Sequence, residues 1–181
     1  MNTLRNFYFL RAGVAFAWAA LAVLLGSAPA AIVGALLVLY PAWDAAANWV
    51  DANASGGLQA NRTQRINVWA SGFTALAVCL ALTAGMNAVL GVFGAWAIAS
   101  GLMQLGTALR RWKSQGGQWV MVLSGAQSAL AGGFFIAQAQ KADVPSIVNV
   151  AGYAGVGALY FLISGIWLSV SLSRRGKQAA A

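Results

Sequence analysis

The sequence predicts an all-α integral membrane protein, a bundle of six transmembrane helices. Of its 181 residues, 60% are hydrophobic and only 8% are charged, whereas about a quarter of the residues of an average soluble protein are charged. Long apolar stretches alternate with short polar ones, and the chain is long enough for six spans of about 20 residues with short turns. We therefore expect residues 1–181 to form a single membrane domain.

The positions of the basic residues predict the topology. Ten of the eleven basic residues lie in four clusters at alternate gaps between the apolar stretches, and Lys141 is the exception. The clusters are Arg5 and Arg11; Arg62 and Arg65; Arg110, Arg111 and Lys113; and Arg174, Arg175 and Lys177. Loops rich in Lys and Arg are retained in the cytoplasm, so both the N-terminus and the C-terminus are expected on the cytoplasmic side.

Turn residues and basic clusters bound each predicted span. The segment Gly26–Pro29 separates the first span from the second, and Gly85 separates the third from the fourth. The polar segment Asp51–Arg65 has no hydrophobic periodicity and is expected to be a flexible loop. The predicted spans are residues 7–25, 31–50, 66–84, 88–109, 118–138 and 147–172.

The N-terminus has one alternative interpretation, a cleaved secretory signal. Arg5 and Arg11, the apolar run and Ala28-Pro29-Ala30 resemble such a signal with its cleavage site. The run is longer than a usual signal core, and cleavage would leave an odd number of spans. We therefore expect the first helix to be retained.

The six spans are predicted to form three repeated helical hairpins. Ser100-Gly101 is followed nine residues after the glycine by Arg110-Arg111, and Ser164-Gly165 is followed at the same spacing by Arg174-Arg175. The copies share one orientation, unlike the inverted repeats of many transporters. Small residues recur at three- and four-residue spacing and predict close helix packing. The candidate packing residues are Gly101, Gly125, Gly132 and Gly165.

Two intramembrane ion pairs are predicted in the first hairpin. Arg11 lies 17 residues before Ala28, at the centre of the outer turn, and Asp44 lies 16 residues after it, so antiparallel helices bring the two to one depth. Arg5 and Asp51 are each 23 residues from the same turn. We expect Arg11 to pair with Asp44, and Arg5 or a loop arginine to pair with Asp51.

Two roles for these charges remain open. The ion pairs could pin the hairpin and offset the cost of burying each charge. Alternatively, Asp44, Asn48, Gln104 and Gln127 could line a polar cavity that binds or conducts a proton or a small solute, because ionisable groups at membrane depth are frequently functional.

Enzymatic and metal chemistry are not expected. The chain has no histidine, three carboxylates and one cysteine, Cys79, within an apolar stretch, so it offers no convincing metal site and no nucleophile with its base. No cofactor is predicted. The net charge of +8 is explained by basic residues flanking spans and facing anionic lipid headgroups, and nucleic acid is not an expected partner. Small-residue stripes are compatible with a homo-oligomer, and the oligomeric state stays open.

Several of these motifs also resemble a known family. Three hairpins, Ser-Gly in the inner half of the even-numbered helices, Arg-Arg at their ends, and Gln118-Trp119 followed by Leu123-Ser124-Gly125 resemble the HdeD-like family of small bacterial six-helix membrane proteins. The resemblance spans about Phe7 to Arg175. It implies a multi-pass protein of the bacterial inner membrane with a role in acid resistance or another stress response, and it supplies no catalytic residues.

Overall fold

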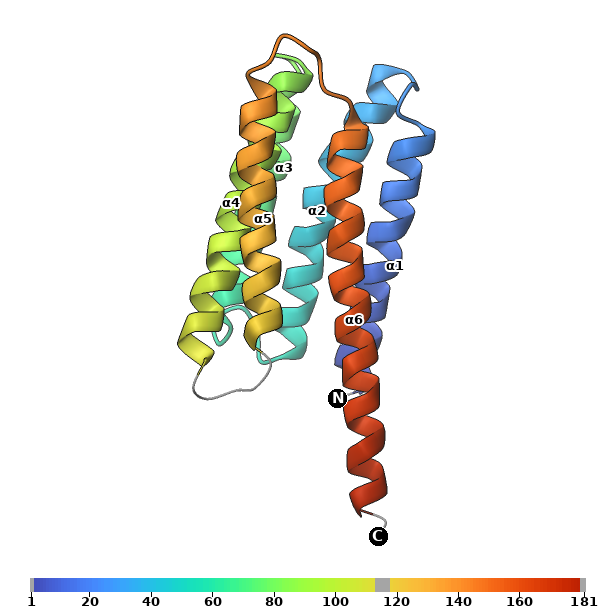
Figure 1. Ribbon diagram of the computed structural model, residues 1–181, viewed down its shortest axis with the longest axis vertical. Helices are drawn as coiled ribbons and strands as arrows, with labels where there is room; N and C mark the ends of the chain where they lie inside the picture. The colour runs from blue at the N-terminus through green and yellow to red at the C-terminus, as the bar shows by residue number, and fades with distance from the viewer. Residues whose placement is uncertain (1, 113–117, 180–181) are drawn as a thin grey trace.

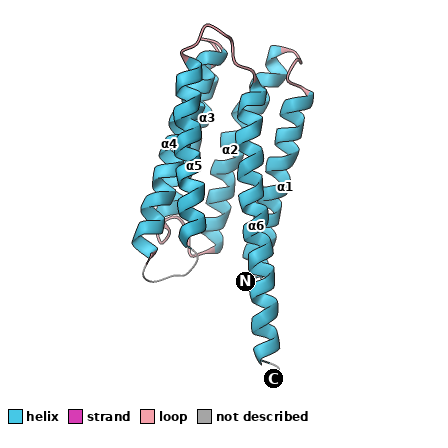
Figure 2. Cartoon of the chain, in the orientation of Figure 1, coloured by secondary structure: helices cyan, strands magenta, loops and turns pink. Residues whose placement is uncertain are grey.

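The computed structural model describes residues 2–112 and 118–179, which fold into six α-helices and contain no strand (Figures 1 and 2). Lys113, one of the basic residues from which the topology was predicted, lies outside the described residues. The helices are α1 (Asn2–Leu24), α2 (Ala30–Ala54), α3 (Arg62–Ala81), α4 (Met86–Arg111), α5 (Gln118–Ala139) and α6 (Ile147–Ala179).

Five of the six helices are long and apolar enough to cross a bilayer, which makes the chain a multi-pass membrane protein. The five segments are Leu4–Leu24, Ala30–Ala54, Met86–Arg110, Gln118–Ala139 and Ile147–Ser173. Helix α3 is not among them, because its first turns carry Arg62, Gln64, Arg65 and Asn67. It lies alongside the other helices in the bundle (Figure 1).

The third predicted span ends earlier than expected. Residues 66–84 were predicted, whereas α3 stops at Ala81 and residues 82–84 form a turn. The amide N–H groups of Thr83 and Ala84 donate to carbonyls only three residues back, and Gly85 follows with a φ of 103°. This left-handed backbone suits glycine and allows the tight reversal into α4.

The prediction of a flexible loop over Asp51–Arg65 is wrong in its extent. Helix α2 continues to Ala54 and α3 begins at Arg62, so the connection is only residues 55–61. The Asn61 side chain amide donates to the carbonyls of Ser55 at 2.7 Å and Gly57 at 2.9 Å. The Asn61 side chain thus provides hydrogen-bond donors for backbone carbonyls of the connection. Hydrophobic periodicity gives no information about such a contact.

The bundle has two distinct ends. At one end, which we call the terminal end, lie the start of α1, the connection 55–61 and the last turns of α6, which extend past the other helices (Figure 1). The other end, which we call the turn end, holds the turns at 25–29 and 82–85 and the segment 140–146. Successive helices therefore run in alternate directions through the bundle.

The predicted hairpins are not the most closely packed pairs of helices. The most extensive contacts are between α4 and α5, between α1 and α6, and between α2 and α3. Helix α1 barely touches α2, and α5 barely touches α6, although each pair is joined by a connection at the turn end. The helices thus form a closed ring in which close and loose contacts alternate.

Glycines explain why α4 and α5 approach so closely. A Cβ atom on Gly101 would lie 2.4 Å from the Gly125 carbonyl oxygen, and one on Gly132 would lie 2.5 Å from the Gly94 carbonyl oxygen. Backbone thus meets backbone at two points, which is the packing that small residues permit in membrane helices. Gly165 of α6 instead faces the ring of Phe9 on α1, where a Cβ would approach carbon atoms at 3.1 Å.

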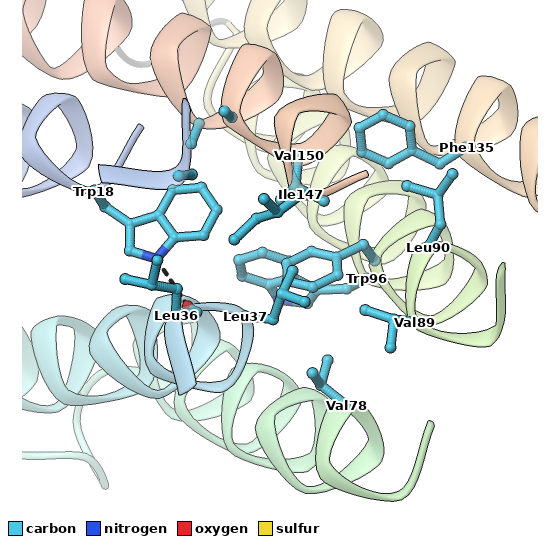
Figure 3. Packing of buried hydrophobic residues seen from close by; sticks show 14 residues of the cluster. Trp18, Leu36, Leu37, Val78, Val89, Leu90, Trp96, Phe135, Ile147 and Val150 are labelled. Atoms are coloured by element: carbon cyan, nitrogen blue, oxygen red, sulfur yellow. Dashed lines mark hydrogen bonds between the residues drawn. The ribbon is translucent and has the colours of Figure 1, made fainter. Parts of the chain in front are cut away.

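A dry core fills the centre of the half of the bundle nearest the turn end (Figure 3). Its fully buried side chains include Leu37, Val78, Phe93 and Ile147, from four different helices. The Trp18 indole N–H donates to the Leu36 carbonyl at 2.8 Å, which satisfies the one polar atom of that ring (Figure 3).

The α4–α5 contact leads to a test with neighbouring glycines. We expect Gly132→Ala to destabilise the bundle by about 1–3 kcal/mol, because the new methyl forces the two backbones apart. Gly133→Ala is the matched control, since nothing lies within 4 Å of a Cβ at Gly133, and alanine favours the helix. Unfolding of both variants in detergent, followed by circular dichroism, measures the difference. Equal stabilities would contradict this account of the contact.

Candidate functional site

A cavity of about 470 Å³ lies inside the ring and is lined by residues of all six helices. Its polar lining is drawn from Arg11, Tyr40, Asp44, Asn48, Thr63, Asn67, Ser100, Gln104, Thr107, Ser124, Gln127, Ser128, Asn149, Tyr153 and Tyr160. The loose contacts of α1 with α2 and of α5 with α6 leave this space open.

The cavity extends along most of the bundle. Ser71 on α3 and Phe161 on α6 mark one level, because both contact the Arg11–Asp44 pair. Thr63 lies eight residues from Ser71 towards the terminal end, and Asn149 lies twelve residues from Phe161 towards the turn end. At 1.5 Å per residue, the lining spans about 30 Å, which is the thickness of the hydrocarbon core of a bilayer.

Asp44 is the centre of a polar network in the cavity wall. Its carboxylate accepts from Arg11 Nη2 and forms an ion pair with that residue. It also accepts from Ser71 Oγ at 2.7 Å and from Asn48 Nδ2 at 3.0 Å. The Arg11 and Asp44 side chains are 12% and 24% exposed, so both charges are largely desolvated and each depends on the other.

The network reaches two further helices through aromatic side chains. The Trp96 indole N–H of α4 donates to Ser71 Oγ at 3.2 Å. The Arg11 guanidinium lies over the Phe161 ring of α6, with Cζ 4.3 Å from the ring centroid, in the geometry of a cation–π interaction. One ion pair thereby connects five helices, α1, α2, α3, α4 and α6.

A second set of polar contacts joins α5 to α6, where the helices barely touch. Tyr160 Oη donates to Gln127 Oε1 at 2.7 Å, and the hydroxyls of Ser128 and Tyr153 lie 2.8 Å apart. Nearer the turn end, Asn149 Nδ2 donates to Gln138 Oε1 at 3.3 Å. We call these three contacts the α5–α6 seam. Polar side chains hold this boundary of the cavity in place of apolar packing.

Two polar atoms of the cavity lining are buried and have no hydrogen-bond partner. They are Arg11 Nε, a donor, and Gln104 Oε1, an acceptor. A buried polar group without a partner costs about 1–3 kcal/mol, so such groups are typically satisfied by water or a ligand. Both residues line the cavity, although the two unpartnered atoms themselves are covered by neighbouring protein atoms.

Aromatic rings form the wall of the cavity on the side of the dry core. The Tyr40 ring stacks on Trp18 with centroids 4.4 Å apart and meets Trp96 edge to face at 5.9 Å. Tyr153 packs edge to face on Phe135, also at 5.9 Å. These rings separate the hydroxyl- and amide-lined space from the purely apolar core.

The four residues of the predicted cavity, Asp44, Asn48, Gln104 and Gln127, all line this one cavity. Arg11 and Asp44 form the expected ion pair. The second expected pair is absent: in the described part of the chain, Asp51 accepts from Gln64 Nε2 at 3.1 Å, and Arg5 donates to its neighbour Asn6. Matching depth did not bring Arg5 to Asp51, because α1 packs on α6 and α2 packs on α3.

Sequence reasoning missed most of the neutral residues of the site. Tyr153 and Tyr160 are seven residues apart on one face of α6, and Ser124, Gln127 and Ser128 recur at helical spacing on α5. Those two stripes were a readable signal of a polar seam. Nothing local marked Ser71 as a partner of Asp44, which is 27 residues away.

No metal site is found in the described ranges 2–112 and 118–179, where no three His, Cys, Asp or Glu residues are grouped to hold an ion. Cys79 is exposed on α3 and is a free thiol.

Fold and site together define a multi-pass helical membrane protein with a partly open cavity whose lining is partly polar. Comparison with known families matches residues 68–137 to a family described as a short repeat of unknown function (DUF308). The match runs from the first half of α3 through α4 into α5, and so contains the close α4–α5 contact. No curated protein and no solved structure matches the chain.

The Asp44 network predicts coupled mutational effects. We expect Asp44→Asn to lower the free energy of unfolding by about 1–3 kcal/mol, because it leaves the Arg11 guanidinium without its counter-ion. Adding Arg11→Gln removes that unpaired charge, so the double variant should lose less stability than the sum of the single variants. Reversible unfolding in detergent gives the coupling energy.

Asp143→Asn is the matched control, since Asp143 is exposed at the turn end and should contribute little. Additive effects of Arg11→Gln and Asp44→Asn would show that the pair does not stabilise the bundle.

Proposed function

We propose that this protein is a non-enzymatic membrane channel or transporter that binds and passes a small uncharged polar solute through the cavity, which runs beside the apolar core in the half of the bundle nearest the turn end. The observation that carries the proposal is the cavity itself, whose lining spans about 30 Å, contains residues of every helix and places hydroxyl and amide groups among a larger apolar surface. A protein that served only to pack against lipid would gain stability from an apolar interior, because hydroxyl and amide groups in a dry bundle are costly to bury.

The dimensions of the cavity favour a small solute. A volume of about 470 Å³ spread over about 30 Å corresponds to a mean cross-section of about 16 Å². This space admits a single file of molecules of the size of water, urea or glycerol. Larger ligands would require the seam between α5 and α6 to open.

The charge of the cavity favours an uncharged solute. Among the residues that the structure describes, Arg11 and Asp44 are the only charged ones that line it, and they neutralise each other as an ion pair. A bare ion would therefore meet no net compensating charge and would pay most of its desolvation cost. A neutral molecule with both a donor and an acceptor would instead reach Gln104 Oε1 and Arg11 Nε, two covered atoms without partners, once those side chains turn towards the cavity.

The absence of catalysis is part of the proposal. The cavity contains several hydroxyl groups, but its one carboxylate is held by Arg11, Ser71 and Asn48. A nucleophilic hydroxyl needs a free general base close by, and the lining residues supply none.

We place the protein in the bacterial inner membrane with the terminal end in the cytoplasm. The basic clusters support this orientation, because Arg62, Arg65 and Arg110 lie at that end whereas Lys141 lies at the turn end. The resemblance to HdeD-like proteins supports the choice of membrane, and the residues that carry it overlap the DUF308 match at Ser100-Gly101 and Gln118-Trp119.

The solute path is tested by filling the cavity. A Cβ on Gly157 would lie 3.9 Å from Tyr40 Oη, and Gly157 lines the cavity, so the side chain of Gly157→Leu should occupy the path. We expect this variant to reduce glycerol and urea flux to that of protein-free liposomes, measured by stopped-flow light scattering. Gly155→Leu, two residues away with nothing within 4 Å of its Cβ, should keep the wild-type flux.

A second variant separates solute binding from folding. Gln104→Met removes the acceptor that lacks a partner while keeping the length of the side chain. It should therefore leave the free energy of unfolding unchanged or raise it. It should also weaken the binding of urea in the cavity. Wild-type flux no greater than that of empty liposomes for both solutes would overturn the proposal. Proton flux is measured in the same liposomes with an internal pH dye. A proton flux above that of empty liposomes, without solute flux, would assign the path to protons.

A role in acid stress is the second proposed function, and the family resemblance favours it. We expect a deletion strain to lose survival under acid challenge and to regain it with the wild-type gene. The Asp44→Asn variant is expressed in the deletion strain at matched membrane abundance. Failure of this variant to restore survival would show that the Asp44 network takes part in acid resistance. Equal survival of the deletion strain and its parent would remove the acid-stress role and leave the solute path untouched.

A further inference from the structure

We propose that a groove between α3 and α4 at the terminal end is a binding site for the phosphate headgroup of an anionic phospholipid. The groove has a volume of about 310 Å³ and is lined by Arg62, Thr63, Ile66, Thr107 and Arg110. It shares Thr63 and Thr107 with the lining of the larger cavity but none of the residues of the Asp44 network, and the inference does not rest on the proposed passage of a solute.

The groove is basic and its charge is not compensated. Arg62 and Arg110 both line it, and none of the three carboxylates of the chain does so. Asp44 pairs with Arg11, Asp51 accepts from Gln64, and Asp143 lies at the turn end. Two guanidinium groups on facing helices are suited to bind the oxygens of one phosphate from both sides.

The Thr107 hydroxyl helps to hold Arg110 beside the groove. Thr107 is buried and donates to the Met103 carbonyl at 2.8 Å, and its Oγ1 accepts a long contact from Arg110 Nη2 at 3.5 Å. Arg110 Nε is held by the Gly106 carbonyl at 3.2 Å. Arg110 is thus anchored to its own helix beside the groove with guanidinium donors to spare.

The surroundings favour a lipid over a free phosphate. Ile66 lines the groove and is 43% exposed, and Leu109, next to Arg110, is 70% exposed. Trp69 and Trp112, at 61% and 54% exposed, lie on the same two helices near this end. Exposed indoles mark the headgroup level of a membrane protein. A phosphate at this depth with apolar surface beside it fits a lipid whose acyl chains continue along α3 and α4.

The test is lipid retention by the full-length protein. Protein is reconstituted in nanodiscs of phosphatidylcholine with a minority of phosphatidylglycerol, extracted in mild detergent, and its retained lipids are counted by native mass spectrometry. We expect one phosphatidylglycerol to be retained over phosphatidylcholine. Each arginine should strengthen the binding of phosphatidylglycerol about five- to sixfold. The double variant Arg62→Gln with Arg110→Gln should therefore weaken its retention about thirtyfold.

The matched control removes the same charge elsewhere. Arg5 is half-buried, Arg65 is exposed, and neither lines the groove, so Arg5→Gln with Arg65→Gln should keep the retained lipid. Equal losses in the two double variants would overturn the site and indicate general surface attraction. Displacement of the lipid by inorganic phosphate at similar concentration would assign the groove to a free anion. Equal retention of phosphatidylcholine would also contradict the proposal.

Discussion

The partly buried Asp44 carboxylate constrains the rest of the bundle. An anion at this depth requires a cation and several donors, and these come from Arg11, Asn48 and Ser71 on three different helices. The requirement fixes the rotation of α1, α2 and α3 about their axes and, through the Trp96 indole, that of α4. Apolar packing alone would leave those rotations weakly specified, because Leu, Val and Ala contacts tolerate many arrangements.

Close and loose contacts alternate around the ring, and the cavity follows from that alternation. Gly94, Gly101, Gly125 and Gly132 bring α4 and α5 into backbone contact, and α6 packs extensively on α1. Once α5 is committed to α4 and α6 to α1, the boundary between α5 and α6 is left open. The sequence places Gln127, Ser128, Tyr153 and Tyr160 there, so this boundary is bridged by hydrogen bonds. Tight packing in one place therefore creates polar space in another.

Sequence reasoning predicted the six helices and the Arg11–Asp44 contact because both depend on one-dimensional quantities. Apolar length and turn residues place helix ends to within a few residues, and distance from a turn gives depth. The lateral position of a residue, meaning which neighbouring helix it faces, does not follow from its distance to a turn. Arg5 and Asp51 share a depth but do not meet, because α1 and α2 diverge to pack on different neighbours. The same limit hid Ser71, since a serine on an otherwise apolar helix shows no sign of which neighbour it faces.

The repeat predicted from the sequence gives a way to compare the helices around the polar site. Its alignment places Asp44 of α2 opposite Gln104 of α4, and the spacing from Gly165 places Leu168 of α6 at the same position. A carboxylate, an amide and an apolar side chain thus occupy one position of the three copies, and only the first two line the cavity. The shared small residues supply the scaffold, whereas the differences between copies supply the charge, the free acceptor and the seam. The Arg11–Asp44 ion pair lies outside the matched residues 68–137, whereas Gln104 lies within them, so the match to a short repeat of unknown function does not extend to the charged part of the site.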